Sequence, residues 1–375
     1  MSNTSDIVTI TTLMDLHFGN SKLPPHECYE RIQKYIYPVL EKTDIFLIGG
    51  DFFDTLLNLD SDAGLFVVKI VSDLISLAKQ HKFYIRVVRG TYSHDRYQNR
   101  LFVVTDKDKV VLNDLPMVRV LTETEIELFP VFNNLSLLYC PDNQPFADLT
   151  QHVIDVIDAH KLPKVDFICS HGYYTHLLPS GIIHVPHNTL DTDKIMARVR
   201  GLALNGHVHT SSIHKRVVSV GSFERFEHGD EGPKGFYIIK YHTKTSSCKY
   251  EFIENKLATP FITVALSTFN SPEETCQYIT NLVDKYRETI LEPRLIYIRL
   301  LGNSPYVTQW LQYELPHVVV TNKNMSFNEQ LDEDVDVSCT ELPIITEENL
   351  ASMIHQNIPN GTLTVKEIQE ILDGK

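Results

Sequence analysis

Short apolar runs alternate with segments of helical spacing along the first two-thirds of the chain. The runs at 7–10, 45–48 and 84–88 are four or five residues long and rich in β-branched side chains, which predicts buried strands. Residues 62–80 and 148–160 instead place apolar side chains three and four positions apart, as an amphipathic helix does. Strands alternating with helices predict an α/β domain with polar side chains at the carboxyl ends of its strands.

Later apolar runs predict further sheets. Runs at 217–220 and 235–241 favour hairpins that complete a second sheet. The pattern then restarts with a run at 261–266, a helix that begins at Ser271-Pro272, and another run at 294–300. This order predicts a small β-α-β unit that follows the first domain.

The end of the chain predicts two short helices. Thr364-Val365-Lys366-Glu367 is a capping box that opens the last one, and its apolar stripe suits either docking onto a partner or tail packing. The predicted division is therefore 1–257, 258–340 and 341–375.

Composition predicts a cytoplasmic protein without a membrane span. The chain has 375 residues, enough for a sizeable core, and its hydrophobic fraction of 43% is ordinary for a globular protein. No apolar run is long enough to cross a bilayer, and the first residues lack the basic segment of a signal peptide. Six scattered cysteines without a C-x-x-C pair indicate reduced thiols.

Metal-binding side-chain types occur in one fixed order, each at the end of an apolar run. They are Asp15 and His17, Asp51, the turn Ser93-His94-Asp95, His171, and His207 with His209. Singly, an Asp-x-His is usually a surface turn and a histidine is more often structural than a ligand. Five such pieces in order, each in the same context, favour a metal site. Two divalent ions a few ångströms apart clamp a phosphate and generate hydroxide at neutral pH, as in a phosphoesterase.

The Gly49-Gly50-Asp51 turn explains how one carboxylate reaches two ions. The glycines permit a tight turn after the buried strand, so that Asp51 can bridge two cations with its two oxygens. A bridging carboxylate suits Mn²⁺, Mg²⁺ or Fe, and imidazole ligands favour transition metals over Ca²⁺. The pattern therefore predicts two divalent ions, with Mn²⁺ as the first choice.

The ordered motifs resemble those of the calcineurin-like metallophosphoesterase superfamily. Within it, Gly50-Asp51-Phe52-Phe53-Asp54-Thr55 resembles SbcD-type DNA repair nucleases and their phage relatives, as does the ending Glu231-Gly232-Pro233-Lys234-Gly235. The resemblance covers roughly the first two-thirds of the chain. It implies a four-layer sandwich of two mixed β-sheets flanked by helices, a small α+β capping domain at 258–340, and a short helical C-terminal tail.

The resemblance also implies a role for each motif residue. One ion would be held by Asp15, His17, Asp51 and His209, and the other by Asp51, His171, His207 and a side chain of the 90–95 turn. His94 would be the acid that protonates the leaving oxygen, oriented by Asp95. The turn is two residues longer than in the family, and Ser93 stands where the family has an asparagine ligand.

The implied function is a metal-dependent DNA nuclease subunit, which hydrolyses phosphodiesters in DNA processing, repair or recombination. Its implied partners are DNA, an SbcC-type ATPase that docks on the C-terminal segment, and a second copy of the chain in a homodimer. Two other classes remain open. One is a small-substrate phosphatase or cyclic-nucleotide phosphodiesterase, and the other is a degenerate scaffold that binds DNA without catalysis.

Charge complicates DNA binding, because the formal net charge is −14 and phosphate contacts are basic. Basic residues nevertheless flank the His94 turn. Arg89, Arg96 and Arg100 are the predicted DNA contacts, with Arg86 nearby, although a solvated face would show the same pattern. Much of the acidic charge falls near 332–336, away from the motifs.

Overall fold

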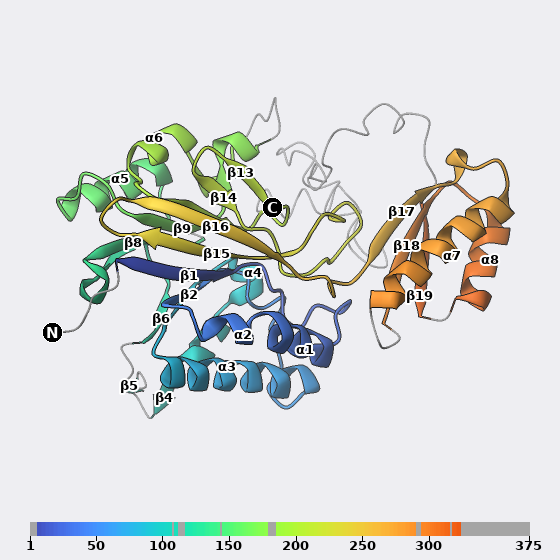
Figure 1. Cartoon of the computed structure of the whole chain (residues 1–375), viewed down its shortest axis with the longest axis horizontal. Coiled ribbons are helices and arrows are strands. Elements are labelled where there is room, and N and C mark those ends of the chain that lie inside the picture. Colours follow the sequence, from blue (N-terminus) through green and yellow to red (C-terminus); the bar gives the residue numbers. More distant parts are fainter. Residues whose placement is uncertain are drawn as a thin grey trace, which may run out of the picture. The chain divides into compact units, whose positions relative to one another are not determined.

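The computed structural model describes residues 6–106, 109–111, 117–142, 145–178, 185–289, 294–315 and 317–323. Two six-stranded mixed sheets with flanking helices form a layered α/β sandwich, as predicted (Figure 1). The segment 341–375, with its capping box, lies outside the described residues, as does the acidic run at 332–336. None of the helices in the described ranges is long and apolar enough to cross a membrane.

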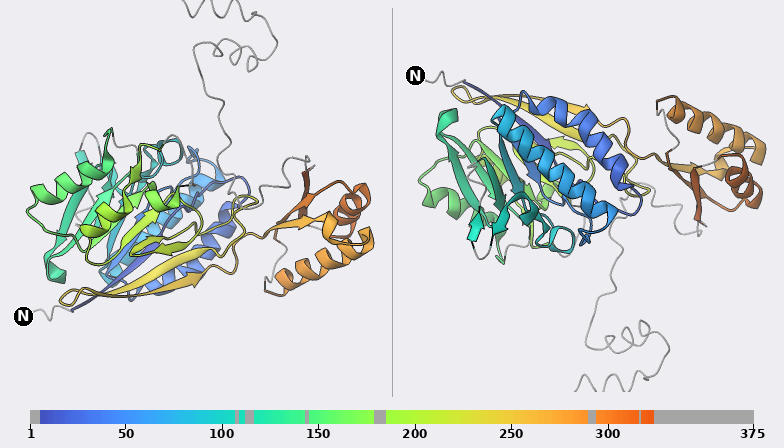
Figure 2. Two further views of the ribbon diagram at one scale, coloured as in Figure 1. Left: turned by 90° about the horizontal axis from the view of Figure 1, so that it is seen from above. Right: turned by 90° about the horizontal axis from the view of Figure 1, so that it is seen from below.

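The first sheet has the strand order β16-β15-β1-β2-β3-β6. Strands β1, β2, β3 and β6 run parallel, whereas β15 lies antiparallel to both β1 and β16. Its strands are β1 (Ile7–Leu13), β2 (Ile45–Gly49), β3 (Tyr84–Val88), β6 (Val118–Leu121), β15 (Gly235–His242) and β16 (Ser247–Glu254). The helices α1 (Pro25–Tyr35), α2 (Tyr37–Leu40) and α3 (Asp62–His81) cover its outer face, as the view from below shows (Figure 2).

The second sheet has the strand order β13-β14-β12-β9-β8-β7, with antiparallel strands at both edges. Its strands are β7 (Glu125–Phe129), β8 (Leu135–Cys140), β9 (Phe167–His171), β12 (Ala203–Gly206), β13 (Ser212–His214) and β14 (Val217–Ser219). The helices α5 (Leu149–Ala159) and α6 (Thr192–Ala197) cover its outer face. Both predicted hairpins form, β13 with β14 and β15 with β16, but only the first belongs to this sheet, because β15 pairs with β1 in the other. Apolar spacing identifies a strand but not its partner.

Three buried apolar clusters fill the three spaces between the four layers. In β2, alternate side chains serve different clusters: Phe46 and Ile48 pack toward α3, whereas Ile45 and Leu47 pack between the sheets. A strand covered on both faces has no polar face, which is why this run is continuously apolar. The third cluster joins the second sheet to α5 and α6.

Beyond residue 257, three parallel strands with two helices form a unit with its own apolar core. Its elements are β17 (Phe261–Ala265), α7 (Pro272–Thr289), β18 (Ile296–Leu301), α8 (Pro305–Glu314) and β19 (Val318–Lys323). The hydroxyl of Ser271 accepts a hydrogen bond from Glu274 N, as expected of an N-cap. Helices alternate with parallel strands here, so this unit is α/β and extends the predicted β-α-β by α8 and β19.

The remaining elements are short. They are β4 (Val104–Asp106) with β5 (Lys109–Val111), β10 (Tyr173–Tyr174) with β11 (Thr189–Leu190), the single-turn α4 (Tyr92–Asp95), and the 3-10 helices η1 (Gln98–Phe102), η2 (Pro130–Phe132), η3 (Thr175–Leu177) and η4 (Leu266–Thr268). The five cysteines in the described ranges are free, in keeping with reduced thiols.

Candidate metal centre

The loops after β1 and β2 hold three predicted ligands in left-handed backbone conformations. Asp15, His17 and Asp51 have φ values of 49°, 46° and 47°. Asp15 N donates to Gly50 O at 3.1 Å and His17 N donates to Asp51 O at 3.0 Å, so the two loops continue the pairing of their strands. Such conformations cost on the order of 1–3 kcal/mol each and persist only where the surroundings enforce them. A side chain at position 50 would collide with the His171 ring, which accounts for the glycine there.

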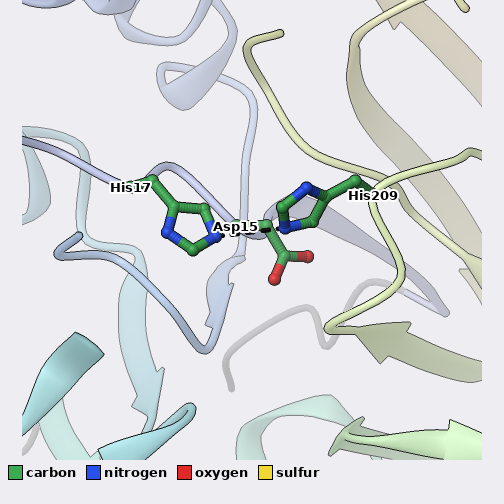
Figure 3. A group of neighbouring side chains, drawn as sticks. All are labelled: Asp15, His17 and His209. Atoms are coloured by element: carbon green, nitrogen blue, oxygen red, sulfur yellow. Dashed lines mark hydrogen bonds between the residues drawn. The ribbon is translucent and has the colours of Figure 1, made fainter. Parts of the chain in front are cut away.

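The first group of candidate ligands is Asp15, His17 and His209, whose donor atoms lie within 4.8 Å of one another. The two imidazole rings come from loops far apart in sequence, and each points a nitrogen atom toward the other beside the Asp15 carboxylate (Figure 3). His17 Nε2 and His209 Nε2 are 3.1 Å apart. Asp54 Oδ1 lies 3.2 Å from His17 Nδ1, on the opposite side of that ring, so Nε2 is the nitrogen left for a ligand role.

The second group is Asp51, His171 and His207, also within 4.8 Å of one another. His171 Nδ1 donates to Gly49 O at 2.9 Å, which orients its ring, and Nε2 lies 3.2 Å from Asp51 Oδ2. The same Oδ2 is 3.9 Å from His17 Nε2 in the first group. Asp51 Oδ1 accepts a hydrogen bond from Thr91 N at 2.6 Å. One carboxylate oxygen therefore faces both groups.

His94 forms a third candidate group with His17 and Asp54, whose donor atoms also lie within 4.8 Å of one another. Its ring centroid is 4.7 Å from that of His17. Its Nδ1 donates to Asp54 O at 2.7 Å, because a carbonyl can only accept. The expectation that Asp95 orients His94 needs a correction. The buried Asp95 carboxylate accepts hydrogen bonds from Gly90 N, Phe53 N and Asn99 Nδ2, so it braces the turn against the neighbouring loop. The Asp54 carbonyl holds His94 instead.

Ser93 is exposed at the surface of the turn. The side chain of this turn that comes near the second group is Thr91, whose Oγ1 lies 3.5 Å from His171 Nε2. The helical turn α4 begins directly after Thr91 and holds Ser93 at the surface. Thr91 was not among the ligands predicted from the sequence.

The three predicted DNA-binding arginines differ in their surroundings. Arg96 and Arg100 are exposed, whereas Arg89 is half-buried and donates through Nη2 to Asp142 O at 3.3 Å. Arg86 is buried and makes two hydrogen bonds of 2.6 Å with Glu127, so it is structural. Arg96 and Arg100 therefore remain available to a ligand.

Two more residues near the site were not predicted from the sequence. Asp230 Oδ2 lies 3.8 Å from His209 Nδ1 and has no hydrogen-bond partner. The other oxygen of Asp230 pairs with Lys234, whose ammonium also donates to His209 O at 2.8 Å. Together they support the loop that carries His209.

Buried charges in the cluster shift each other's pKa values in opposite directions. Burial opposes the charged form of His171, but the Asp51 and Asp15 carboxylates outweigh it and raise its pKa to about 10. Burial, and next the charge of His171, lower the pKa of His207 to about 4. Burial raises the pKa of Asp15 to about 6.

The donor set fits a pair of divalent transition-metal cations. It contains two carboxylates and four imidazoles, and the closest donor atoms are 3.1 and 3.2 Å apart. Two ligands on one ion, each at about 2.1 Å, are separated by roughly 3.0–3.4 Å. Nitrogen and oxygen donors together suit Mn²⁺, Fe or Zn²⁺ better than Ca²⁺.

Comparison with known proteins adds no family assignment. No protein-family model matches the chain, and no curated protein matches its sequence. A hypothetical protein from Thermus thermophilus is similar in structure, with 10% identity and a TM-score of 0.38 over 66% of this chain and 99% of that one. GAP50, the anchor in the inner membrane complex of Plasmodium, has 13% identity and a TM-score of 0.38 over 67% of this chain and 85% of that one. Similarity at this level carries no inference about function.

Proposed function

We propose that this chain is a metal-dependent phosphodiesterase that acts on DNA, of the SbcD type within the calcineurin-like metallophosphoesterases. The observation that carries the proposal is the position of Asp51 Oδ2, which faces His171 Nε2 at 3.2 Å and His17 Nε2 at 3.9 Å. A carboxylate between two histidine groups is the arrangement that holds two ions a few ångströms apart.

Each residue would have a defined task. Asp15, His17 and His209 would hold one cation, His171 and His207 the other, and Asp51 would bind both. When bound, the two cations would clamp a phosphate and make water a stronger nucleophile. His94 is held through Nδ1, which leaves Nε2 to carry a proton to the leaving oxygen. Arg96 and Arg100 would attract flanking phosphates.

The decisive experiment offers labelled single- and double-stranded DNA to the purified chain with Mn²⁺, Mg²⁺ or a chelator. We expect Mn²⁺-dependent cleavage that the chelator and the Asp51→Ala variant abolish. Asp155→Ala, at an exposed position on α5, is the matched control. A DNA-inert chain that hydrolyses p-nitrophenyl phosphate would instead indicate a small-substrate phosphatase. Binding of DNA without hydrolysis of either substrate would indicate a scaffold.

The proposed macromolecular partners are an SbcC-type ATPase and a second copy of the chain. Truncation after Thr340 tests the first of these. The shortened chain should keep Mn²⁺-dependent cleavage of short DNA and lose binding to the ATPase. If it still binds the ATPase, the docking segment lies elsewhere.

A further inference from the structure

A cavity of about 640 Å³ lies beside the His94 turn and contains none of the candidate metal ligands. One wall is the loop that follows Asp54, with Leu56 and Leu59, and the other is the segment that carries Tyr92, Arg96, Tyr97 and Arg100. Cavities of this size accommodate small organic molecules, whereas protein partners usually dock on flatter surfaces. The side chains that line the cavity therefore indicate which class of small molecule it would bind.

Gln98 holds the two walls together. Its Oε1 accepts a hydrogen bond from Leu57 N at 2.8 Å, and its Nε2 donates to Thr55 O at 2.9 Å. Both ends of the amide are thus used to connect the walls. The cavity is preformed, so a ligand would not have to order these segments on binding.

The lining combines exposed aromatic and aliphatic surface with positive charge. The side chains of Leu56, Tyr92 and Tyr97 are 58%, 48% and 61% exposed. The Arg100 guanidinium lies 5.0 Å from the centroid of the Tyr97 ring, and the rings of Tyr92 and Tyr97 meet edge to face at 5.7 Å. Tyrosine and arginine surfaces that stack on flat rings, with cationic groups for phosphate, are the chemistry that binds single-stranded nucleotides.

The position of the cavity indicates which nucleotide it would bind. Tyr92 is two residues before His94, and Leu56 is two residues after Asp54, whose carbonyl holds the His94 ring. Both walls thus continue directly from the His94–Asp54 pair. The proposed role of His94 is to protonate the leaving oxygen, so the group attached to that oxygen lies on the side of His94.

We propose that this cavity is the subsite for the nucleobase on the leaving side of the cleaved phosphodiester, with Tyr97 as its stacking surface. The assignment of the base to the leaving side of the cleaved linkage rests on the proposed function. The proposal that the cavity binds a base does not. The same surface could otherwise be covered by a second copy of this chain, and the experiments below distinguish the two occupants.

The first experiment measures binding without metal or catalysis. Saturation-transfer NMR with deoxyadenosine, in the presence of a chelator, should show contact with the wild-type chain. Tyr97→Ala and Leu56→Ala should each lose most of this signal. Tyr313→Ala, a tyrosine 77% exposed on α8, should keep it. Absence of transfer to the wild type, or equal transfer to all variants, would overturn the subsite.

The second experiment tests whether the bound base lies on the leaving side of the cleaved linkage. Short oligonucleotides carry an abasic site either on the leaving side of a single cleavable linkage or on the other side. Loss of the leaving-side base should lower kcat/KM about ten- to one-hundred-fold through KM, the range expected for one stacked base. Tyr97→Ala should cleave both substrates equally. Equal effects of the two abasic sites on the wild type would overturn the side assignment.

Two further outcomes separate the possible failures. If deoxyadenosine binds but no DNA is cleaved under any condition, the proposed function fails and the base-binding cavity stands. If sedimentation shows that Tyr97→Ala turns a wild-type dimer into a monomer, the cavity belongs to an interface between copies and the proposal is overturned. An unchanged melting temperature of the variants supports a local effect, as expected for such exposed side chains.

Discussion

The backbone N–H of His207 donates to both carboxylate oxygens of Asp15, at 2.9 and 3.0 Å. Asp15 follows β1 in the first sheet, and His207 follows β12 in the second. These hydrogen bonds therefore join the loop after β1 to the loop after β12, at the point where these two candidate metal groups meet. The packing of the sheets thereby sets the separation of the groups.

Replacement of Asp51 should empty both cation sites. Asp51→Ala removes the only carboxylate that faces both groups among the described residues. We expect the metal content, measured by inductively coupled plasma mass spectrometry, to fall well below that of the wild type, and nuclease activity to disappear with it. Asp155→Ala should retain both the metal content and the nuclease activity of the wild type. Two tightly bound ions in Asp51→Ala would contradict the bridging role.

Replacement of His94 should slow the reaction without loss of metal. General acid–base groups contribute ~10²–10⁴-fold, so His94→Gln should reduce kcat by that range. The metal content should stay at the wild-type level, since the Asp54 carbonyl holds Nδ1 of His94 and His94 lies outside the two groups that Asp51 connects. His26→Gln, at an exposed position on α1, is the control. Loss of metal from His94→Gln would make His94 a ligand instead.

The 90–95 turn offers a direct comparison of two hydroxyl side chains. Thr91→Val removes the hydroxyl that lies 3.5 Å from His171 Nε2, and Ser93→Ala removes an exposed one. We expect Thr91→Val to weaken the binding of one cation about ten- to one-hundred-fold, as changes around metal ligands do. Ser93→Ala should leave both affinities unchanged in a metal titration. The reverse result would restore Ser93 as the ligand.

The buried pair of Arg86 and Glu127 should be important for stability. Glu127→Gln leaves the 1% exposed Arg86 side chain without its charged partner, which should cost about 3 kcal/mol of unfolding free energy. Glu125→Gln breaks a pair with the 40% exposed Arg119 and should cost less than about 1 kcal/mol. Urea unfolding measures the free energy of unfolding of both variants. Equal losses would show that the burial of Arg86 does not matter.

The contribution of Glu127 should also depend on pH. Burial opposes the charge on Glu127, but the hydrogen bonds from Arg86 outweigh it and lower the pKa from its ordinary value of 4.5. The stabilisation is therefore fully present above that ordinary value and is lost as the pH falls through the lowered pKa. The stability difference between the wild type and Glu127→Gln should be constant from pH 7 to about 5 and shrink below. A difference that grows on acidification would contradict this assignment.

Much of the layered fold follows from local patterns. The strands around Ile45 and Tyr84 and the helix from Asp62 were predicted because their apolar spacing is regular and their ends carry clear signals. The partner of the strand at 235–242 was not predictable in this way, since pairing depends on contacts more than two hundred residues apart. The third strand of the last unit, β19, lies beyond the pattern that was recognised.

The candidate ligands were found because strand ends collect polar side chains at one edge of a sheet. Motif order placed six of the seven predicted ligands in two of the three groups that the described residues form, and the third group contains His94 with His17 and Asp54. The surface position of Ser93 and the contacts of Asp95 were not predictable from motif order, because they depend on the helical turn α4 and on bonds to Phe53 and Asn99. Asp54 belongs to a motif but was given no role, and only its position against His17 and His94 indicates one.

The pairing of β1 with β15 has a consequence for synthesis on the ribosome. Ile7 pairs with His242, so one side of the first strand has no partner until nearly two-thirds of the chain has been made. At roughly 5–20 residues per second, this interval is about 10–50 s. During it, the nascent chain exposes a bare apolar strand edge, which is a template for aggregation. The first sheet can therefore close on this side of β1 only late in synthesis.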